Sequence, residues 1–327
     1  MTISSNEPFH SPSEKQRLVL FDGHAIIYRA YHAFTDLTSP DGMLVNAVYG
    51  FSRILLTVLR DIGPEYCVVT FDHKGPTQRS QVYDAYKAQR PPMPDDLKPQ
   101  IDVIKSIVET LNIPQFSLEG YEADDLIGTI TAQLADQPSV LSTVVTGDKD
   151  LFQLVTDQVN VWIPARASKF GGNKTDTEYD AEAVYKRIGV WPNQVVDLKA
   201  LMGDPSDNIP GVKGVGPKTA VALITTFQTV DGVYQAVEDP EVVATHPKLL
   251  KPGLVEKLVR DKDQAYLSRE LATINRQVPI KFQLDDCLVT SYDKERVTKR
   301  FEELEFRSLI HLLPKDEFEL AVQQALF

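Results

Sequence analysis

The stretch "RLVLFD" at residues 17–22 is a run of apolar residues that ends in a single aspartate. An apolar run without polar alternation is typical of a strand that is buried on both faces of a parallel sheet. Two other runs have the same character and the same ending, "EYCVVTFD" at 65–72 and "VLSTVVTGD" at 140–148. Helical patterns separate the runs, at 47–63, 97–113 and 123–137. Strands that alternate with helices predict an α/β domain with a parallel sheet.

The strand signal fades from about residue 180, and helical patterns follow at 181–190, 192–203, 217–227 and 252–274. The sequence then predicts one strand, "VPIKFQL" at 278–284, and two further helices. No Gly/Ser linker marks the change, so we expect the helical part to pack directly on the α/β part. The expected divisions are a flexible tail over 1–16, an α/β core over 17–185, a helical region over 186–290 and C-terminal helices over 291–327.

Composition excludes several classes of protein. The chain has 327 residues, of which 43% are hydrophobic and 24% charged, so it can bury a sizeable core. Its two cysteines, Cys67 and Cys287, lie far apart, and its six histidines are scattered. These counts predict a reducing compartment and neither a disulfide framework nor a zinc site. No apolar run approaches the roughly 18 to 20 residues of a membrane helix, so we expect a cytoplasmic protein with no membrane partner.

Acidic residues recur where the predicted strands end. Asp22, Asp72 and Asp148 each close one apolar run, and the carboxyl ends of parallel strands meet at one edge of a sheet. Further acids stand in "EADD", "GDKD" and "GDPSDN". The nine candidate acids are Asp22, Asp72, Glu122, Asp124, Asp125, Asp148, Asp150, Asp204 and Asp207. Each acid alone could instead cap a helix or favour its dipole, but a converging set would repel unless it were protonated or neutralised.

Divalent cations would neutralise such a set. Magnesium prefers hard oxygen ligands, and two ions about 4 Å apart can activate water and stabilise a departing phosphodiester oxygen. The absence of His and Cys from the set favours Mg²⁺ or Mn²⁺ over zinc. The net charge of −12 argues at first against nucleic acid. However, without these nine of its 46 acids the chain would carry 37 acids against 34 Lys and Arg, so a basic DNA track is compatible with its charge.

The glycine-rich stretch "NIPGVKGVGPKTAVAL" at 208–223 is a candidate phosphate-binding element. Its three glycines, Gly211, Gly214 and Gly216, allow a tight hairpin between two helices. Pro217 suits the first turn of the second helix, where exposed amides can bind a phosphate beside Lys213 and Lys218. The alternative is a plain glycine-rich turn. A Walker A loop is excluded because Pro217 follows Gly216 where that motif needs lysine.

The polar, basic and aromatic segment 73–98 is a second candidate element. Tyr83, Tyr86, Lys87 and Arg90 stand at i, i+3, i+4 and i+7, so on a helix they would form one face of rings and cations. Such a face suits unpaired nucleotides, which stack on rings and bind cations through phosphate. The alternative is an exposed, solvated loop.

Six ordered motifs resemble the 5′ nuclease family, and most specifically the 5′→3′ exonuclease domains of bacterial DNA polymerase I; phage 5′ nucleases and eukaryotic flap endonucleases are more distant. The motifs are "VLFDGHAIIYRAYHA", "VVTFDHKGPTQR", "YDAYKAQRPPMP", "GYEADDLIGT", "VVTGDKDLFQLV" and "LKALMGDPSDNIPGVKGVGPKTA", and they span about residues 17–312. The resemblance implies a PIN-like core with a parallel sheet, a helical arch at about 73–98 and a helix-hairpin-helix at 208–223.

The resemblance also implies a reaction and a set of roles. The reaction is metal-dependent hydrolysis of phosphodiester bonds near a 5′ flap or 5′ end, in primer removal and DNA repair. Asp22, Asp72, Glu122, Asp124 and Asp125 would serve one metal ion, and Asp148, Asp150, Asp204 and Asp207 the second. The cations at the scissile phosphate would be Lys87 and Arg90, and Lys199 would be another basic catalytic residue of the site. The DNA contacts would be Tyr28, Arg29, Arg79, Tyr83, Tyr86, Gly211, Lys213, Gly214, Gly216 and Lys218, with K⁺ at the hairpin.

The family's partners are DNA with a 5′ flap or 5′ end, RNA–DNA hybrids and a DNA polymerase in cis or in trans. From the resemblance we expect a monomer associated with the bacterial nucleoid. No polymerase motif follows the nuclease motifs, so the chain is either a free-standing nuclease or an excised domain. Two rival functions stay open, a junction-binding protein without activity and a nuclease directed at RNA.

Overall fold

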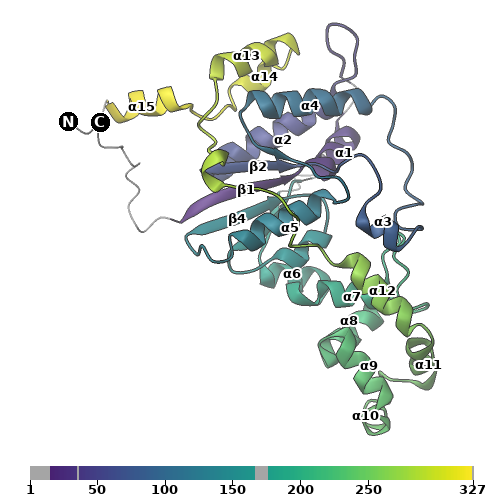
Figure 1. Ribbon diagram of the computed structural model, residues 1–327. Coiled ribbons are helices and arrows are strands. Elements are labelled where there is room, and N and C mark those ends of the chain that lie inside the picture. The colour runs from purple at the N-terminus through teal and green to yellow at the C-terminus, as the bar shows by residue number, and fades with distance from the viewer. Residues whose placement is uncertain (1–14, 35–36, 166–175, 326–327) are drawn as a thin grey trace.

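A six-stranded sheet forms the centre of the molecule (Figure 1), and three of its strands are the predicted apolar runs, whereas those at 115–116, 159–163 and 177–179 were not predicted. The computed structural model describes residues 15–34, 37–165 and 176–325. The strands are β1 (Gln16–Asp22), β2 (Tyr66–Thr70), β3 (Gln115–Phe116), β4 (Val140–Val145), β5 (Val159–Ile163) and β6 (Thr177–Tyr179). Their order is β3-β2-β1-β4-β5-β6, and every pair is parallel except β5 with β6. The predicted α/β class with a parallel sheet is therefore confirmed.

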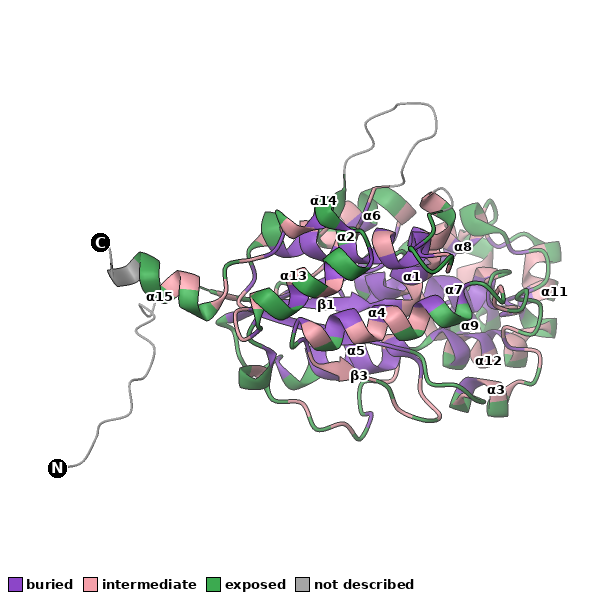
Figure 2. Ribbon diagram, turned by 90° about the horizontal axis from the view of Figure 1, so that it is seen from above, coloured by how far each residue is buried: buried purple, intermediate pink, exposed green. Residues whose placement is uncertain are grey.

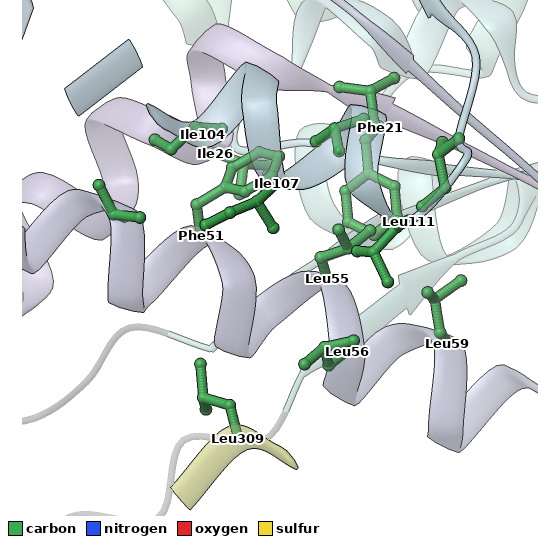
Figure 3. Packing of buried hydrophobic residues seen from close by; sticks show 14 of the residues in the cluster. Phe21, Ile26, Phe51, Leu55, Leu56, Leu59, Ile104, Ile107, Leu111 and Leu309 are labelled. Carbon is green, nitrogen blue, oxygen red and sulfur yellow. The ribbon is translucent and has the colours of Figure 1, made fainter. Parts of the chain in front are cut away.

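The central strand β1 shows why the sheet needs helices on both faces. Leu18 and Leu20 point into one core and Val19 and Phe21 into the other, and none of the four is exposed. Because side chains alternate along a strand, an unbroken apolar run must be covered twice. Figure 3 shows Phe21 among side chains of the helices on one face.

Those covering helices match the predicted ranges closely. The helices of the α/β part are α1 (Gly23–Ala33), α2 (Asn46–Ile62), α3 (Gln78–Val82), α4 (Lys98–Thr110), α5 (Ala123–Gln133), η1 (Asp150–Leu154) and α6 (Ala181–Ile188). Helix α2 ends where Gly63 adopts a left-handed conformation. Helices α1, α2 and α4 cover one face of the sheet and α5 the other (Figure 1).

The helical region has a core of its own. Its helices are η2 (Pro192–Gln194), α7 (Val195–Met202), α8 (Pro217–Phe227), α9 (Val230–Glu238), α10 (Pro240–Thr245), α11 (Pro252–Arg260) and α12 (Lys262–Ala272). The chain then returns to the sheet through η3 (Leu284–Cys287), α13 (Lys294–Glu303), α14 (Arg307–Ile310) and α15 (Glu317–Ala325). Figure 2 shows buried residues along the sheet and the inner faces of its helices. In the part of the chain that the structure describes, no helix is long and apolar enough to cross a membrane.

Four expectations about elements were wrong. The segment 278–284 is not a strand. Ile280, Phe282 and Leu284 pack on the sheet's second core, but the segment does not pair with a neighbouring strand. Its alternation of apolar and polar residues therefore reflects burial alone. The single helix expected over 252–274 breaks at Asp261 into α11 and α12. Three helices, not two, follow η3. Gln16 belongs to β1 rather than to the tail, whose residues 1–14 lie outside the described part.

Candidate active site

Parallel pairing brings the strand-end acids to one edge of the sheet. Asp22 ends β1, and Asp72 and Asp148 follow the neighbouring strands β2 and β4. A cleft of about 620 Å³ opens there, and these three acids line it together with Glu122 and Asp124 from the start of α5. The cleft is also lined by His24, Tyr28, Arg29, Lys87 and Arg90. Five of the nine predicted acids therefore meet at one site.

Asp22 is held rigidly at the floor of this cleft. Its carboxylate caps α1 by accepting a hydrogen bond from the Ala25 amide at 3.2 Å, and it accepts a second from the Thr146 hydroxyl at 2.8 Å. Burial, then the neighbouring charges of Asp72 and Asp148, raise the pKa of Asp22 to about 7, and both hydrogen bonds oppose that rise. A carboxyl in this position ionises readily only when a cation joins it.

Asp150, Asp204 and Asp207 form a second acidic group beside the cleft. The Asp150 amide donates to the Asp148 carboxylate at 2.9 Å, which joins the two groups. Lys199 is buried and donates to Asp150 and, at 2.6 Å, to Asp204. Burial and Asp148 raise the pKa of Asp150 to about 7, although Lys199 opposes the rise. Lys199 thus neutralises part of this acidic group, and its expected catalytic role stays a prediction.

The segment over the cleft is not the helix that the spacing predicted. Helix α3 ends at Val82, and successive turns carry Tyr86 and Lys87, the latter with a φ of 55°. Tertiary contacts take the backbone groups that a helix would use: the Lys87 amide donates to the Asp207 carbonyl at 2.9 Å, and the Asn208 side chain donates to the Ala85 carbonyl at 2.7 Å. The rings and cations therefore do not share one helical face.

The cations of this segment point into the site all the same. The Lys87 ammonium donates to Glu122 at 2.6 Å, and the Arg90 guanidinium donates to Asp207. Tyr86 is only 7% exposed, and its hydroxyl donates toward Glu122 at 3.2 Å and Asp207 at 3.3 Å. Tyr86 is thus a buried hydrogen-bonding residue, and the expectation that it stacks on DNA from an exposed face was wrong.

Arg79 and Asp125 also differ from expectation. Arg79 is buried and pairs with Asp125, so its guanidinium faces the protein interior rather than DNA. Asp125 does not line the cleft, because its carboxylate turns toward Arg79. Asp125 was expected among the metal ligands, but the fold places its carboxylate on Arg79, outside the lining of the cleft.

The glycine-rich hairpin connects α7 to α8 as predicted, and Pro217 begins α8. Lys213, Gly214, Gly216 and Lys218 are exposed there, although the Lys213 amide already donates to the Asp261 carboxylate at 2.9 Å. Gly211 is buried instead: its amide donates to the Ser268 hydroxyl at 2.9 Å, and its carbonyl accepts from Gln264 at 2.6 Å. Gly211 is a structural residue of the hairpin.

Two residues of the site escaped the sequence reasoning. The His24 ring accepts a hydrogen bond from the Asp72 amide at 3.0 Å, and burial lowers its pKa, which favours the neutral ring. Its position two residues after Asp22 was the available signal. Lys257 approaches the hairpin from α11, since a Cβ on Gly214 would lie 3.0 Å from its ammonium. Only the fold brings Lys257 there. Arg29, by contrast, donates to the Pro164 carbonyl within the protein.

The donor set suits a hard divalent cation. Its atoms are carboxylate oxygens. Burial first, and then the charges of Asp72 and Asp148, raise the pKa of Asp22, and a neighbouring cation would oppose that rise. Among the described residues, no three His, Cys, Asp or Glu side chains are already gathered as a formed metal site. Lys87, Arg90 and Lys199 bind the carboxylates of Glu122, Asp207, Asp150 and Asp204 instead. The site thus has ligands that a metal could recruit by displacing these ammonium and guanidinium groups.

Family models cover most of the chain. Residues 17–189 match the "5′-3′ exonuclease, N-terminal resolvase-like domain", and residues 190–295 match the "5′-3′ exonuclease, C-terminal SAM fold". The chain belongs to the 5′–3′ exonuclease family. It is similar to DNA polymerase I of Chloroflexus aurantiacus, with 42% identity over 91% of this chain and 30% of the relative. DNA polymerase I of Bacillus subtilis is 38% identical over 96% of this chain and 34% of the relative.

The chain therefore spans about a third of the length of these relatives. Two solved nuclease structures have a similar fold. The first is a bacteriophage T5 5′-exonuclease with bound zinc ions, with a TM-score of 0.60 and 20% identity over 90% of this chain and 100% of that chain. The second is the catalytic core of Rad2 in complex with DNA substrate, with a TM-score of 0.55 and 18% identity over 91% of this chain and 93% of that chain. The 5′–3′ exonuclease family thus accounts for both the parallel-sheet core and the helical region.

Proposed function

We propose that this member of the 5′–3′ exonuclease family hydrolyses phosphodiester bonds of DNA near a 5′ flap or 5′ end, with two divalent metal ions. One observation carries the proposal: carboxylates from three parallel strand ends and from α5 meet in one cleft that also holds Lys87 and Arg90. The relatives are named DNA polymerase I, which supports a role beside a DNA polymerase, and primer removal and DNA repair are part of the same proposal. Nucleoid association, acceptance of RNA–DNA hybrids and a monomeric state remain proposals of the same kind.

Asp22, Asp72, Asp148, Glu122 and Asp124 would hold the first metal ion and share the second with Asp150, Asp204 and Asp207. Magnesium, or manganese in its place, would supply positive charge against the scissile phosphate and a lowered pKa for water. The chain's own residues do the rest. Lys87 and Arg90, once released from Glu122 and Asp207, lie where they can bind the phosphate. Neutral His24 orients the Asp72 backbone beside them.

The exposed hairpin would hold the duplex at a distance from this cleft. Its open amides at the start of α8, with Lys213, Lys218 and Lys257, offer a backbone phosphate several donors. A K⁺ ion at hairpin carbonyls is part of the same proposal. Phosphate contacts carry no base sequence, so recognition would follow the shape of the junction. The division into a core over 17–185, a DNA-binding region over 186–290 and C-terminal helices over 291–327 belongs to this proposal.

The test is cleavage of a labelled 5′-flap duplex. We expect wild-type cleavage with Mg²⁺ and none with EDTA. Asp148→Asn should bind the flap in EDTA as the wild type does, yet cleave it at least about 100-fold more slowly, since a ligand of the proposed metal ions is lost. If the wild type binds flaps but never cleaves them with either Mg²⁺ or Mn²⁺, the chain is the rival junction-binding protein. If Asp148→Asn cleaves normally, Asp148 does not belong to the site.

A further inference from the structure

Arg79 lines a second pocket of the molecule, together with Asp125 and Arg269. The Arg79 side chain is 10% exposed, and it donates to both carboxylate oxygens of Asp125, at 2.6 Å and 3.1 Å. It also lies 3.1 Å from Glu122 and 3.4 Å from Asp124, two acids that line the active cleft. A further N–H donates to the Thr273 carbonyl at 3.1 Å. One side chain thus contacts α3, α5 and the segment after α12.

Asp125 is fixed from the other side by backbone amides. It accepts from the Asn275 amide at 2.8 Å and from the Glu122 amide at 3.1 Å. Two backbone donors and a bidentate guanidinium saturate its oxygens, so its carboxylate has no free lone pair to offer a ligand in the cleft. We call Arg79, Asp125 and their partners at residues 273–275 the ionic latch.

We infer that Arg79 is a positioning residue for the proposed reaction, and that Asp125 is its anchor rather than a metal ligand. The latch holds Glu122 and Asp124 toward the cleft from behind, and it fixes α3 at the base of the segment that carries Lys87 and Arg90. The inference rests on the proposed function. The inference extends the proposed function, because it assigns Arg79 and Asp125 to the alignment of the site rather than to contact with DNA or metal.

The strength of such a latch follows from its burial. Removing one partner of a buried, hydrogen-bonded ion pair leaves the other charge without compensation, so the surrounding elements must shift. The first turn of α5 would move with Asp125, because the Glu122 amide is one of its donors. A displacement of about 1 Å at a reacting group can slow a reaction about 100-fold. DNA affinity should change little, since Arg79 is buried away from solvent.

The experiment compares Arg79→Met and Arg79→Lys with Arg269→Met. Arg269 lies across the same pocket, of about 510 Å³, but it is 36% exposed and pairs with Asp231 and Asp197 away from the cleft. We expect Arg79→Met to cleave bound flap at least about 100-fold more slowly in single turnover, with flap affinity in EDTA within about threefold of wild type. It should also need more Mg²⁺ for half-maximal rate. Arg79→Lys should recover part of the rate, and Arg269→Met should behave as wild type.

A second measurement, limited proteolysis, tests the ionic latch without metal ions and without an activity assay. In EDTA, chymotrypsin should cut Arg79→Met at Tyr83 or Tyr86 several-fold faster than wild type or Arg269→Met, because the segment loses its anchor. Loss of flap affinity in parallel with rate would show a direct DNA contact and overturn the inference. Unchanged rate and unchanged proteolysis would overturn it as well. If the wild type never cleaves flaps, the proposed function fails, whereas the proteolysis result still decides whether the latch exists.

Discussion

Asp22 combines burial with two acidic neighbours, a combination that is unfavourable in a protein without bound metal. The residue is 7% exposed, and its two hydrogen bonds only partly offset burial and the charges of Asp72 and Asp148. A carboxyl whose pKa in the folded state lies above its value in the unfolded chain binds protons more tightly when folded. Its contribution to stability is therefore present at low pH and is lost as the pH rises from about 4 to about 7.

Replacing this charge should stabilise the metal-free protein, and more so at high pH. Asp22→Asn should have a larger free energy of unfolding than wild type in EDTA. We expect this stability advantage to be about 2 to 3 kcal/mol larger at pH 8 than at pH 5. Urea unfolding at the two pH values measures it. Saturating Mg²⁺ should remove the advantage of the variant at pH 8. A difference that is independent of pH would mean that Asp22 is not the group that titrates.

Lys87 offers a test of the cations over the cleft. Its ammonium is held by Glu122 at 2.6 Å, so it is already positioned at the site. Lys87→Met should lower the single-turnover rate about 100- to 1,000-fold, because a donor aimed at developing charge is lost. Lys98→Met is the control, since Lys98 pairs with Asp95 on the surface at 2.7 Å. Equal effects of the two substitutions would show that only overall charge matters.

The hairpin between α7 and α8 depends on glycine at one position more than at the others. Gly211 has a φ of 61°, and a Cβ there would lie 2.2 Å from the Gly203 amide nitrogen. Gly216 has an extended conformation, and a Cβ there would meet nothing within 4 Å. The two glycines of one motif thus have different reasons to be present: Gly211 lets two stretches of backbone touch, and Gly216 leaves the start of α8 open.

Alanine substitutions should separate these two reasons. Gly211→Ala should lower the free energy of unfolding by about 2 to 4 kcal/mol, from left-handed strain plus overpacking. Gly216→Ala should cost less than about 1 kcal/mol, because the N-cap position of α8 tolerates a methyl group in open space. Thermal or urea denaturation measures both. If Gly216→Ala proved as costly as Gly211→Ala, a general rigidity of the hairpin would explain the loss better than close contact.

The two parts of the molecule are joined through buried hydrogen bonds as well as through packing. Gln153 in η1 donates to the Ala272 carbonyl at 3.0 Å and accepts from the Ile274 amide at 3.0 Å, and both partners lie at or just after the end of α12. Gly128 in α5 adds close packing, since a Cβ there would lie 2.5 Å from Ile274. The helical region therefore packs directly on the α/β core, as the lack of a linker predicted.

Cutting this joint should destabilise the whole molecule. Gln153→Ala leaves a buried amide and carbonyl unpaired, so we expect a loss of about 2 to 4 kcal/mol in the free energy of unfolding. Gln158→Ala is the matched control, because Gln158 is only half-buried and its side chain donates to the Gln137 carbonyl, within the α/β part. Calorimetry should show one shifted transition for Gln153→Ala. Two separate transitions would mean that the parts unfold independently once the joint is cut.

Local patterns in the chain were sufficient for three adjacent strands of the sheet, most of its covering helices and most of the acidic cleft. Apolar runs such as 17–22 can be satisfied only by burial on both faces, and parallel strands must place Asp22, Asp72 and Asp148 at one edge. The hairpin followed from its glycines and Pro217 in the same way. These features depend on neighbours within a few residues, which a sequence displays directly.

Long-range contacts decided the rest. The rings and cations of 83–90 have helical spacing, yet the Asp207 carbonyl accepts from the Lys87 amide and the Asn208 side chain donates to the Ala85 carbonyl. These contacts, from more than a hundred residues away, turn the segment out of a helix. Arg79 is of a residue type that often contacts DNA, but Asp125 and the Thr273 carbonyl hold its guanidinium inside the fold. A charged side chain pairs with the groups that the fold places around it. Those groups lie far away in the sequence, so a local pattern does not identify them.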